Sequence, residues 1–290
     1  APVRNRGIKL GYDNFAVRAM KWKAPALIDY AAQIKTDSLF ITDLMAFESF
    51  EDAYLNDLRK KAADVGVQMV LGSWSICPTS KSFKDTWGTA IEHGALTMRM
   101  AKALGSPVAR FILGNASDRK TPGGIQARIA DTVAVCKQLK PYYENLGVKI
   151  AVENHAGDMQ SIELVELIEA AGKEYVGANM DTGNGMWTLE DPMVTLNNLA
   201  PYVLTTSLRD TMLWESPKGA TAQWVAMGDG VVDHATFFDV FEKKCPGVAV
   251  HIETIGGFNK DLNYLEPGFF DQYPKPVSYT HLTLPTNREV

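Results

Sequence analysis

Acidic residues close several apolar segments of this sequence. Glu153, Asp181 and Glu253 each stand at the end of a short apolar run. Buried carboxylates repel one another strongly unless a proton or a cation lies between them. Carboxylate oxygens suit a hard divalent ion, so we expect Mn²⁺ or Mg²⁺, with Co²⁺ or Zn²⁺ as alternatives. The three residues therefore predict a metal site, provided that the fold brings the ends of their segments together.

The apolar segments themselves have the character of buried strands. Eight strands are predicted, over about 8–12, 38–44, 67–73, 107–114, 148–153, 175–181, 203–208 and 247–253. They are mostly apolar instead of alternating, as expected of parallel strands covered on both faces. Helices are predicted between them, over about 25–35, 52–65, 87–104, 124–146, 161–171, 190–200 and 234–244. Glycines such as Gly66 and Gly105 suit the left-handed position that ends a helix.

This alternation of strands and helices predicts a single α/β domain. Eight parallel βαβ units close into a (β/α)8 barrel, the TIM barrel. An open, doubly wound sheet is the alternative, but it would need a glycine-rich phosphate loop after its first strand, and residues 11–15 (GYDNF) do not form one. In a barrel the active site lies at the carboxyl ends of the strands. Because neighbouring strands lie about 4.8 Å apart, Glu153, Asp181 and Glu253 are expected to converge there.

Other residues at the ends of strands are candidates for binding a substrate. Asp43 ends the second predicted strand and Trp74 follows the third. His155 follows the fifth strand, where it would orient the substrate, and Arg209 follows the seventh, where it would hold a hydroxyl or carboxylate group. Aromatic side chains in these loops, such as Trp74, are suited to wall a pocket.

Four short motifs, in order and in register with the strands, resemble a known family. They are VENHAG over 152–157, DTGN over 181–184, SLRD over 207–210 and GDGVVD over 228–233. With the strand that ends at Glu253, they resemble the xylose-isomerase-like TIM barrel superfamily, the sugar phosphate isomerase/epimerase group. The resemblance covers essentially residues 7–257.

The resemblance implies a metal held by four ligands. Three of them correspond to Glu153, Asp181 and Glu253, whereas the fourth, a histidine in the family, corresponds to Ser207. A neutral hydroxyl is a weaker ligand than an imidazole, so we expect lower metal affinity and a preference for oxygen-seeking ions. Asn184 stands where some relatives have a histidine that contacts the substrate.

The predicted function is that of a metal-dependent isomerase or epimerase of a sugar, sugar phosphate or inositol derivative. The metal would polarise the oxygens of the sugar as a Lewis acid. Glu153 and Glu253 would remove and return a proton on the carbon next to the carbonyl. One alternative is a degenerate barrel that binds sugars without turnover, which Ser207 favours. A hydrolase like endonuclease IV is another, but such sites need more histidines than this chain offers.

Composition narrows the range of partners. The formal net charge of −5 argues against a nucleic-acid partner, because a phosphate backbone attracts a basic surface. No apolar run reaches about 18 residues, so no membrane span is expected. The expected partner is a small sugar, and a homo-oligomer is left open. The cysteines, three in number and far apart, do not indicate a disulfide framework.

The two ends of the chain are unusual. It begins with Ala-Pro instead of Met, which leaves cytoplasmic and exported locations equally open. Residues 277–286 (VSYTHLTLPT) resemble a translated sequencing-library adapter. We therefore predict one barrel domain over 1–276, a non-native tail over 277–290, and truncation of the last barrel helix.

Overall fold

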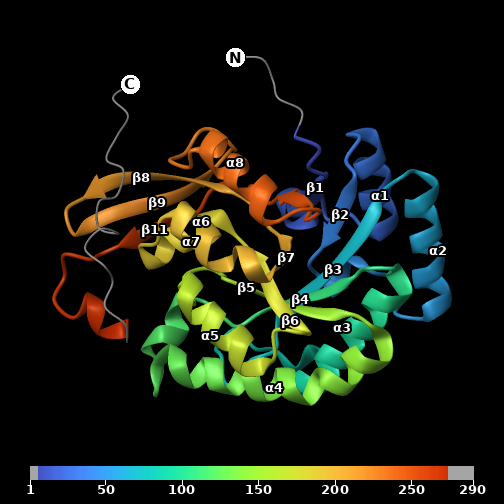
Figure 1. Cartoon of the computed structure of the whole chain (residues 1–290), viewed down its shortest axis with the longest axis horizontal. Coiled ribbons are helices and arrows are strands. Elements are labelled where there is room, and N and C mark those ends of the chain that lie inside the picture. The colour runs from blue at the N-terminus through green and yellow to red at the C-terminus, as the bar shows by residue number, and fades with distance from the viewer. Residues whose placement is uncertain (1–5, 274–290) are drawn as a thin grey trace.

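A parallel barrel forms the centre of the protein, in a computed structural model that describes residues 6–273 (Figure 1). Its eight strands are β1 (Leu10–Asp13), β2 (Ser38–Ile41), β3 (Gln68–Ser75), β4 (Val108–Ile112), β5 (Lys149–Glu153), β6 (Val176–Met180), β7 (Val203–Thr206) and β10 (Val250–Ile252). Their order is β10-β1-β2-β3-β4-β5-β6-β7. All eight predicted strands and the TIM barrel fold are confirmed.

The barrel closes between β7 and β10. Leu208 forms a parallel bridge with Ile252 just beyond the end of β7. The amide of Leu208 donates to the carbonyl of His251 (2.7 Å), and the amide of Glu253 donates to the carbonyl of Leu208 (2.8 Å). These bonds fix the backbone of Glu253 directly beside the end of β7.

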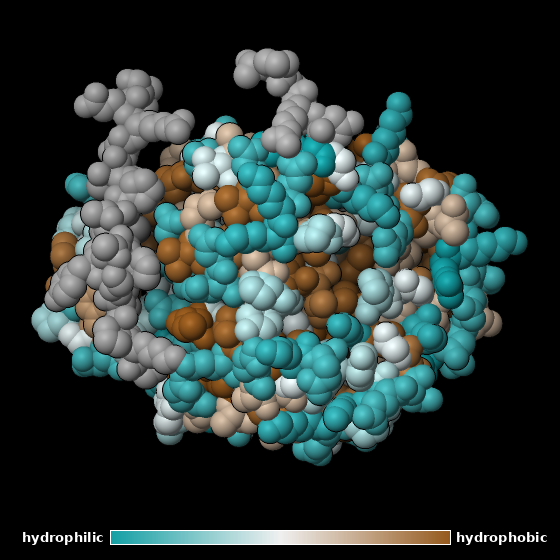
Figure 2. All heavy atoms as spheres, in the orientation of Figure 1, coloured by the Kyte–Doolittle hydropathy of each residue, from teal (hydrophilic) through white to brown (hydrophobic). Residues whose placement is uncertain are grey.

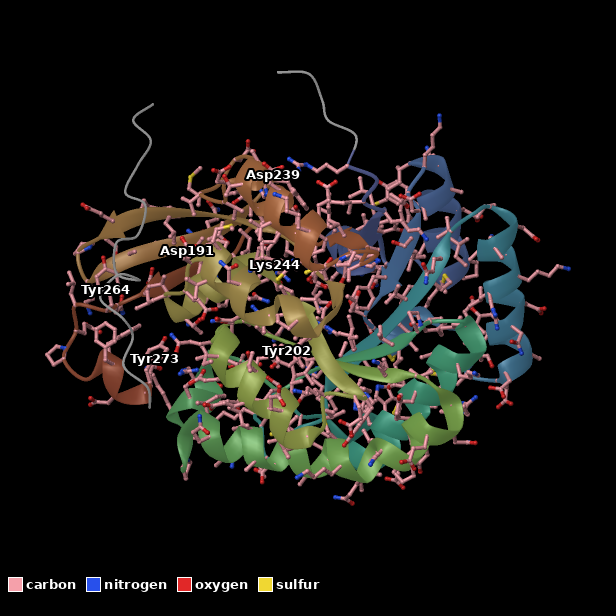
Figure 3. All side chains as sticks on the ribbon, in the orientation of Figure 1. Asp191, Tyr202, Asp239, Lys244, Tyr264 and Tyr273 are labelled. Atoms are coloured by element: carbon pink, nitrogen blue, oxygen red, sulfur yellow. The ribbon has the colours of Figure 1, made fainter. Side chains whose placement is uncertain are left out.

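Helices surround the strands, as Figure 1 shows. They are α1 (Ala24–Gln33), α2 (Asp52–Asp64), α3 (Ala90–Leu104), α4 (Gly124–Leu146), α5 (Ser161–Ala171), α7 (Pro192–Leu199) and α8 (His234–Lys244). Local signals set their ends: Thr89 and Glu92 form a capping box at the start of α3, and Gly105 ends it with φ 76°. Asp191 caps α7 by accepting from the amide of Met193 (2.7 Å; Figure 3).

Short helical turns lie in several loops at the carboxyl ends of the strands or between longer elements. They are η1 (Asn14–Met20), η2 (Leu44–Ala46), η3 (Asp85–Trp87), η4 (Ala116–Lys120), α6 (Thr182–Gly185), η5 (Met186–Thr188), η6 (Ala200–Tyr202) and η7 (Phe269–Gln272). Of these, η1, α6 and η5 follow β1 and β6 and carry residues of the candidate site.

The inside of the barrel has an apolar floor beneath a polar layer. The floor is a cluster separate from the main core, formed by Phe40, Val70, Val108, Ala151 and Leu204. Side chains two positions apart on a strand share a face. Positions 42, 110 and 153 therefore lie one layer nearer the carboxyl ends, and they carry threonine, arginine and glutamate. The strand register thus stacks charged groups on apolar ones inside the barrel.

A second sheet stands at one side of the barrel, at the left of Figure 1. It contains β8 (Asp210–Ser216), β9 (Gly219–Val225) and β11 (Asn259–Leu262), all antiparallel. No strand was predicted between 208 and 247, yet most of the segment 211–230 is a hairpin. Gly219 turns the hairpin with φ 148°, a conformation that side chains disfavour.

The segment after β10 differs from an outer barrel helix. Between Glu253 and Tyr273, the structure has β11 and η7 and no α-helix. The predicted tail over 277–290 and any truncated helix lie outside the described residues. No helix of the described chain is long and apolar enough to span a membrane. On the face shown in Figure 2, hydrophilic residues cover the helices along the lower edge, and apolar ones show in the middle.

Candidate active site

Three carboxylates meet at the carboxyl end of the barrel. Glu153 ends β5, Asp181 follows β6, and Glu253 follows β10. Each side chain is buried, and one oxygen from each lies within 4.8 Å of the others. A fourth buried carboxylate, that of Asp13 at the end of β1, lies close enough to interact electrostatically with Glu253. The trio is close enough to hold a metal ion.

Two buried arginines already pair with these carboxylates. The Nε atom of Arg110 donates to Glu153 (2.6 Å), and its Nη2 atom contacts the same carboxylate. The Nη2 atom of Arg209 lies 2.7 Å from Asp181 and also contacts Glu253. With Asp13, the cluster thus has four carboxylates against two guanidiniums. With every carboxyl ionised, negative charge would exceed positive charge, and either two protons or one divalent cation would neutralise the difference.

Amide and hydroxyl groups complete the cluster. Asn184 donates to Asp181 (2.7 Å) and Glu153 (3.2 Å). Asn179 donates to Glu153 (2.7 Å) and to the hydroxyl of Ser207 (3.1 Å). That hydroxyl in turn donates to a carboxylate oxygen of Asp13 (3.3 Å). Ser207 therefore bridges Asn179 to the edge of the cluster, and Asn184 ties two of the three acids together.

The four carboxyl groups differ in pKa. Burial raises the pKa of Asp13 to about 6 and that of Asp181 to about 7, although neighbouring arginines oppose the shift. Burial also raises the pKa of Glu253 well above its usual value. For Glu153, burial is outweighed by the charges around it, chiefly Arg110, so its pKa is lowered. Burial thus favours the protonated forms of Glu253, Asp181 and Asp13, whereas the charges around Glu153 favour its ionised form.

A cavity of about 240 Å³ opens onto this cluster. Its charged lining residues are Arg110, Arg209 and Glu253, and its aromatic ones are Phe15, Trp74, Trp187, Trp224 and Phe258. Trp187 and Trp224 stack face to face, with centroids 4.5 Å apart. The ring of Trp224 also covers the guanidinium of Arg209 at 4.2 Å. An aromatic cavity with a few converging charged groups is typical of a site for a small molecule.

Of the residues predicted to bind substrate, Trp74, His155 and Arg209 line this cavity. The Nδ1 atom of His155 lies 2.7 Å from the carbonyl of Gly114, so it must carry the proton and leaves Nε2 as an acceptor. Burial lowers the pKa of His155 to about 4, which keeps the imidazole neutral. Asn184 is bonded to the carboxylates and does not line the cavity.

Asp43, predicted to bind substrate, does not line the cavity. Its side chain is exposed and caps η2 by accepting from the amide of Met45 (2.8 Å). Because successive side chains alternate between the two faces of a strand, Thr42 takes the inward direction at the end of β2 and lines the cavity. The structure thus places Thr42, and not the predicted Asp43, at the cavity.

Sequence reasoning missed Asp13, Arg110 and Asn179, which all lie in the buried cluster. Arg110 did carry a signal, since it is a single cation within an otherwise apolar run. Asp13 directly follows the first predicted strand, like the acids that were recognised. Asn179 is inside a strand, and only the register shows that it faces Glu153.

A larger hollow of about 610 Å³ lies beside this cavity, between η4 and the segment from β11 to η7. It shares only Ala156 and Trp187 with the smaller cavity and includes none of the clustered carboxylates. On the side of η4, Arg119 forms a buried ion pair with Glu163 (2.7 Å). The Cζ atom of its guanidinium lies 4.2 Å from the ring centroid of Tyr273, which is labelled in Figure 3. The smaller cavity is the one that reaches the carboxylates and arginines.

Comparison with known proteins identifies the family. The family model described as xylose isomerase-like TIM barrel matches residues 28–267. The chain belongs to this family. It is 23% identical over 211 residues to the 3-oxo-isoapionate decarboxylase of Pectobacterium atrosepticum, covering 72% of this chain and 69% of that protein.

Solved structures of low sequence identity share the fold of this family member. An L-ribulose 3-epimerase superposes with a TM-score of 0.65 at 16% identity, covering 86% of this chain and 82% of that one. The IOLI protein, described with a bound zinc atom, superposes with a TM-score of 0.64 at 14% identity, covering 91% of both chains. At this identity, the likeness concerns the fold alone.

The fit of a metal ion to this site depends on Arg209. The donors suit an ion, since three carboxylate oxygens lie within 4.8 Å of one another. However, one guanidinium nitrogen already bonds both Asp181 and Glu253, and its side chain is only 2% exposed. An ion shared by all three acids would have to displace this cation. The trio therefore matches a metal in donor type and spacing, but the arrangement around Arg209 does not fit one.

Proposed function

We propose that the protein is a sugar-modifying enzyme that forms an enolate next to the carbonyl of a small sugar or sugar-derived acid. The observation that carries the proposal is the position of Glu253. Its carboxyl group lines the aromatic cavity, has a raised pKa and contacts the buried guanidinium of Arg209. A proton-transferring group beside a fixed cation is the arrangement that enolate chemistry requires.

In this proposal Glu253 is the acid–base residue. A carboxyl group whose pKa lies above its usual value transfers protons more effectively near neutral pH than an ordinary glutamate. Arg209 and Arg110 line the same cavity, and they would stabilise the negative charge that develops on the carbonyl oxygen. His155, neutral and with Nε2 free to accept, would bind a hydroxyl group of the substrate.

We assign Glu153 a different role from the proton transfer that the sequence suggested. Its side chain is fully buried, does not line the cavity and binds Arg110, Asn179 and Asn184. Glu153 would hold Arg110 in place. With one acid–base residue, a proton removed from a carbon can be returned to the neighbouring carbon on the same face. The proposal therefore favours isomerisation over epimerisation, which needs groups on both faces.

The similarity to a decarboxylase fits the same intermediate. That relative is named for a 3-oxo acid, and loss of CO₂ from such an acid leaves an enolate. Two arginines in the cavity are suited to bind a carboxylate group of a sugar acid. The substrate class proposed here is therefore keto sugars and their acids. The cations of the proposed chemistry are Arg209 and Arg110, and it does not require Mn²⁺ or Mg²⁺, the ions expected from the carboxylates.

Solvent-exchange spectroscopy tests the proposal without knowledge of the product. The protein is incubated in D₂O with a panel of keto sugars and sugar acids, and NMR follows loss of the C–H signal next to the carbonyl. Glu253→Gln is expected to slow exchange by a factor of about 10²–10⁴ while the fold is retained. Glu51→Gln, the same change at an exposed position before α2, is the matched control. Full exchange activity in Glu253→Gln would sink the assignment.

A second candidate is a barrel that binds sugars without converting them. Ser207 favours it, because its hydroxyl group bonds to Asn179 and Asp13 at the position where the family resemblance implies a metal-binding histidine. Calorimetry on the same panel separates the two readings. Binding of a sugar with no exchange and no product would support the second candidate, whereas catalysed exchange would exclude it.

A further inference from the structure

One guanidinium holds the centre of the carboxylate trio. The Nη2 atom of Arg209 contacts Asp181 and Glu253 at once, and these two acids come from neighbouring segments on either side of β7. The side chain that carries it is 2% exposed. A single nitrogen that bridges two buried carboxylates occupies the position that a shared ion would need.

The surroundings of Arg209 are shaped to its side chain. A Cβ atom at Gly183 would overlap the Cγ atom of Arg209, so the missing side chain at 183 makes room for the arginine stem. Trp224 lies flat over the guanidinium at 4.2 Å, a favourable cation–π arrangement. The backbone carbonyl of Arg209 accepts from the hydroxyl of Thr182 (2.5 Å). Three neighbours on two elements thus hold the arginine in this position.

Ser207 occupies the position at which the family resemblance implies the fourth metal ligand. Ser207 precedes Arg209 by two residues and bonds to Asn179 and Asp13, with no bond to the trio among the described residues. An imidazole there would offer a ligand nitrogen, whereas a hydroxyl offers a weak one. The loss of the ligand and the presence of the cation therefore point in the same direction.

We propose that Arg209 replaces the divalent ion, so that this barrel excludes metal from the carboxylate trio. The Nη2 atom links Asp181 to Glu253, and the buried Nε atom, which has no partner among residues 6–273, is the donor left for an oxygen of the substrate. That last role rests on the proposed function, whereas the exclusion of metal does not. A divalent ion placed between these carboxylates would be repelled by the guanidinium, because two like charges a few ångström apart interact strongly inside a protein.

Metal content measured directly tests the exclusion, independently of turnover. Wild type, Arg209→Met, Ser207→His/Arg209→Met and Arg110→Met are loaded with excess MnCl₂, desalted and subjected to elemental analysis. Wild type is expected to retain far less than one equivalent of manganese. The double variant is expected to bind Mn²⁺ at least about tenfold more tightly than wild type, since a repelling charge is removed and an imidazole added.

Arg110→Met is the control for Arg209→Met. Arg110→Met removes the same charge from the cluster but leaves the guanidinium between Asp181 and Glu253, so it should gain little affinity. Equal gains in both arginine variants would refute a role specific to position 209. Near one equivalent of manganese in wild type, or no gain in the folded double variant, would overturn the proposal. If the variants fail to fold, a rise in the Tm of wild type with MnCl₂ would overturn it equally, and an unchanged Tm supports it.

Discussion

Replacing Arg110 with methionine would remove half of the positive charge in the buried cluster. Arg110 is 3% exposed, and it is the guanidinium that bonds Glu153, which is fully buried. Without it, that carboxylate keeps only the amide donors of Asn179 and Asn184. Methionine fills much of the same volume with a flexible chain, so the cost of a cavity is small. The variant therefore measures what an unpaired buried charge costs.

The expected magnitude follows from burial. Removing one partner of a buried ion pair costs about 3–5 kcal/mol, because the remaining charge is uncompensated. The pKa of Glu153 is lowered in the folded protein, so its pairing stabilises the fold above the ordinary glutamate value of about 4.3. That contribution is lost as pH falls through the lower folded value. The difference between wild type and Arg110→Met should be full at neutral pH and shrink in acid.

Urea unfolding followed by circular dichroism measures this difference at several pH values. Arg110→Met/Glu153→Met serves as the control, because replacing both partners by apolar groups removes the unpaired charge and should restore much of the stability. A loss below about 0.5 kcal/mol in the single variant at neutral pH would refute the reasoning, since surface substitutions alone reach that size. A loss that does not change with pH would show that packing, not charge, is responsible.

Two further perturbations act on the same region. Burial raises the pKa of Asp13 to about 6 and of Asp181 to about 7, so the folded state binds more protons than the unfolded chain. The free energy of unfolding should therefore fall by a few kcal/mol as the pH rises from about 4 to about 7. Asp13→Asn/Asp181→Asn should flatten this dependence in urea titrations, and an unchanged slope would contradict the assignment. Trp224→Ala removes the stack on Trp187 and should cost about 3–5 kcal/mol; a loss below that of an exposed aromatic such as Trp214→Ala would show that the stack does not stabilise the protein.

Regular patterns made most of the barrel predictable. Runs such as the one that ends at Glu153 are apolar on both faces, and this is visible without knowledge of their partners. The hairpin of β8 and β9 was missed because β8 carries apolar residues on both faces: Met212 and Trp214 are exposed, whereas Leu213 is buried. This removes the alternation of apolar and polar residues that marks a half-exposed strand.

Candidate site residues that end or directly follow a strand could be predicted from the sequence, whereas those inside strands could not. Glu153, Asp181 and Glu253 stood out because each follows an apolar run. Whether a residue points into the barrel depends on register, and a shift of one position reverses the answer. Asp43 is an outward-facing acid that was predicted to bind substrate, and Arg110 is an inward-facing cation within a predicted strand that was not recognised as part of the site.

The sheet of β8, β9 and β11 ties together two chain segments that flank β10 in the sequence. Trp224 on β9 and Phe258 just before β11 meet over the cavity with ring centroids 5.6 Å apart. Because backbone hydrogen bonds join β9 to β11, the wall of the cavity on this side is built from two paired segments and not from one loop. An engineer who wishes to change the size of the accepted sugar would have to exchange 210–225 and 258–262 together, since either graft alone would leave a strand without its partner.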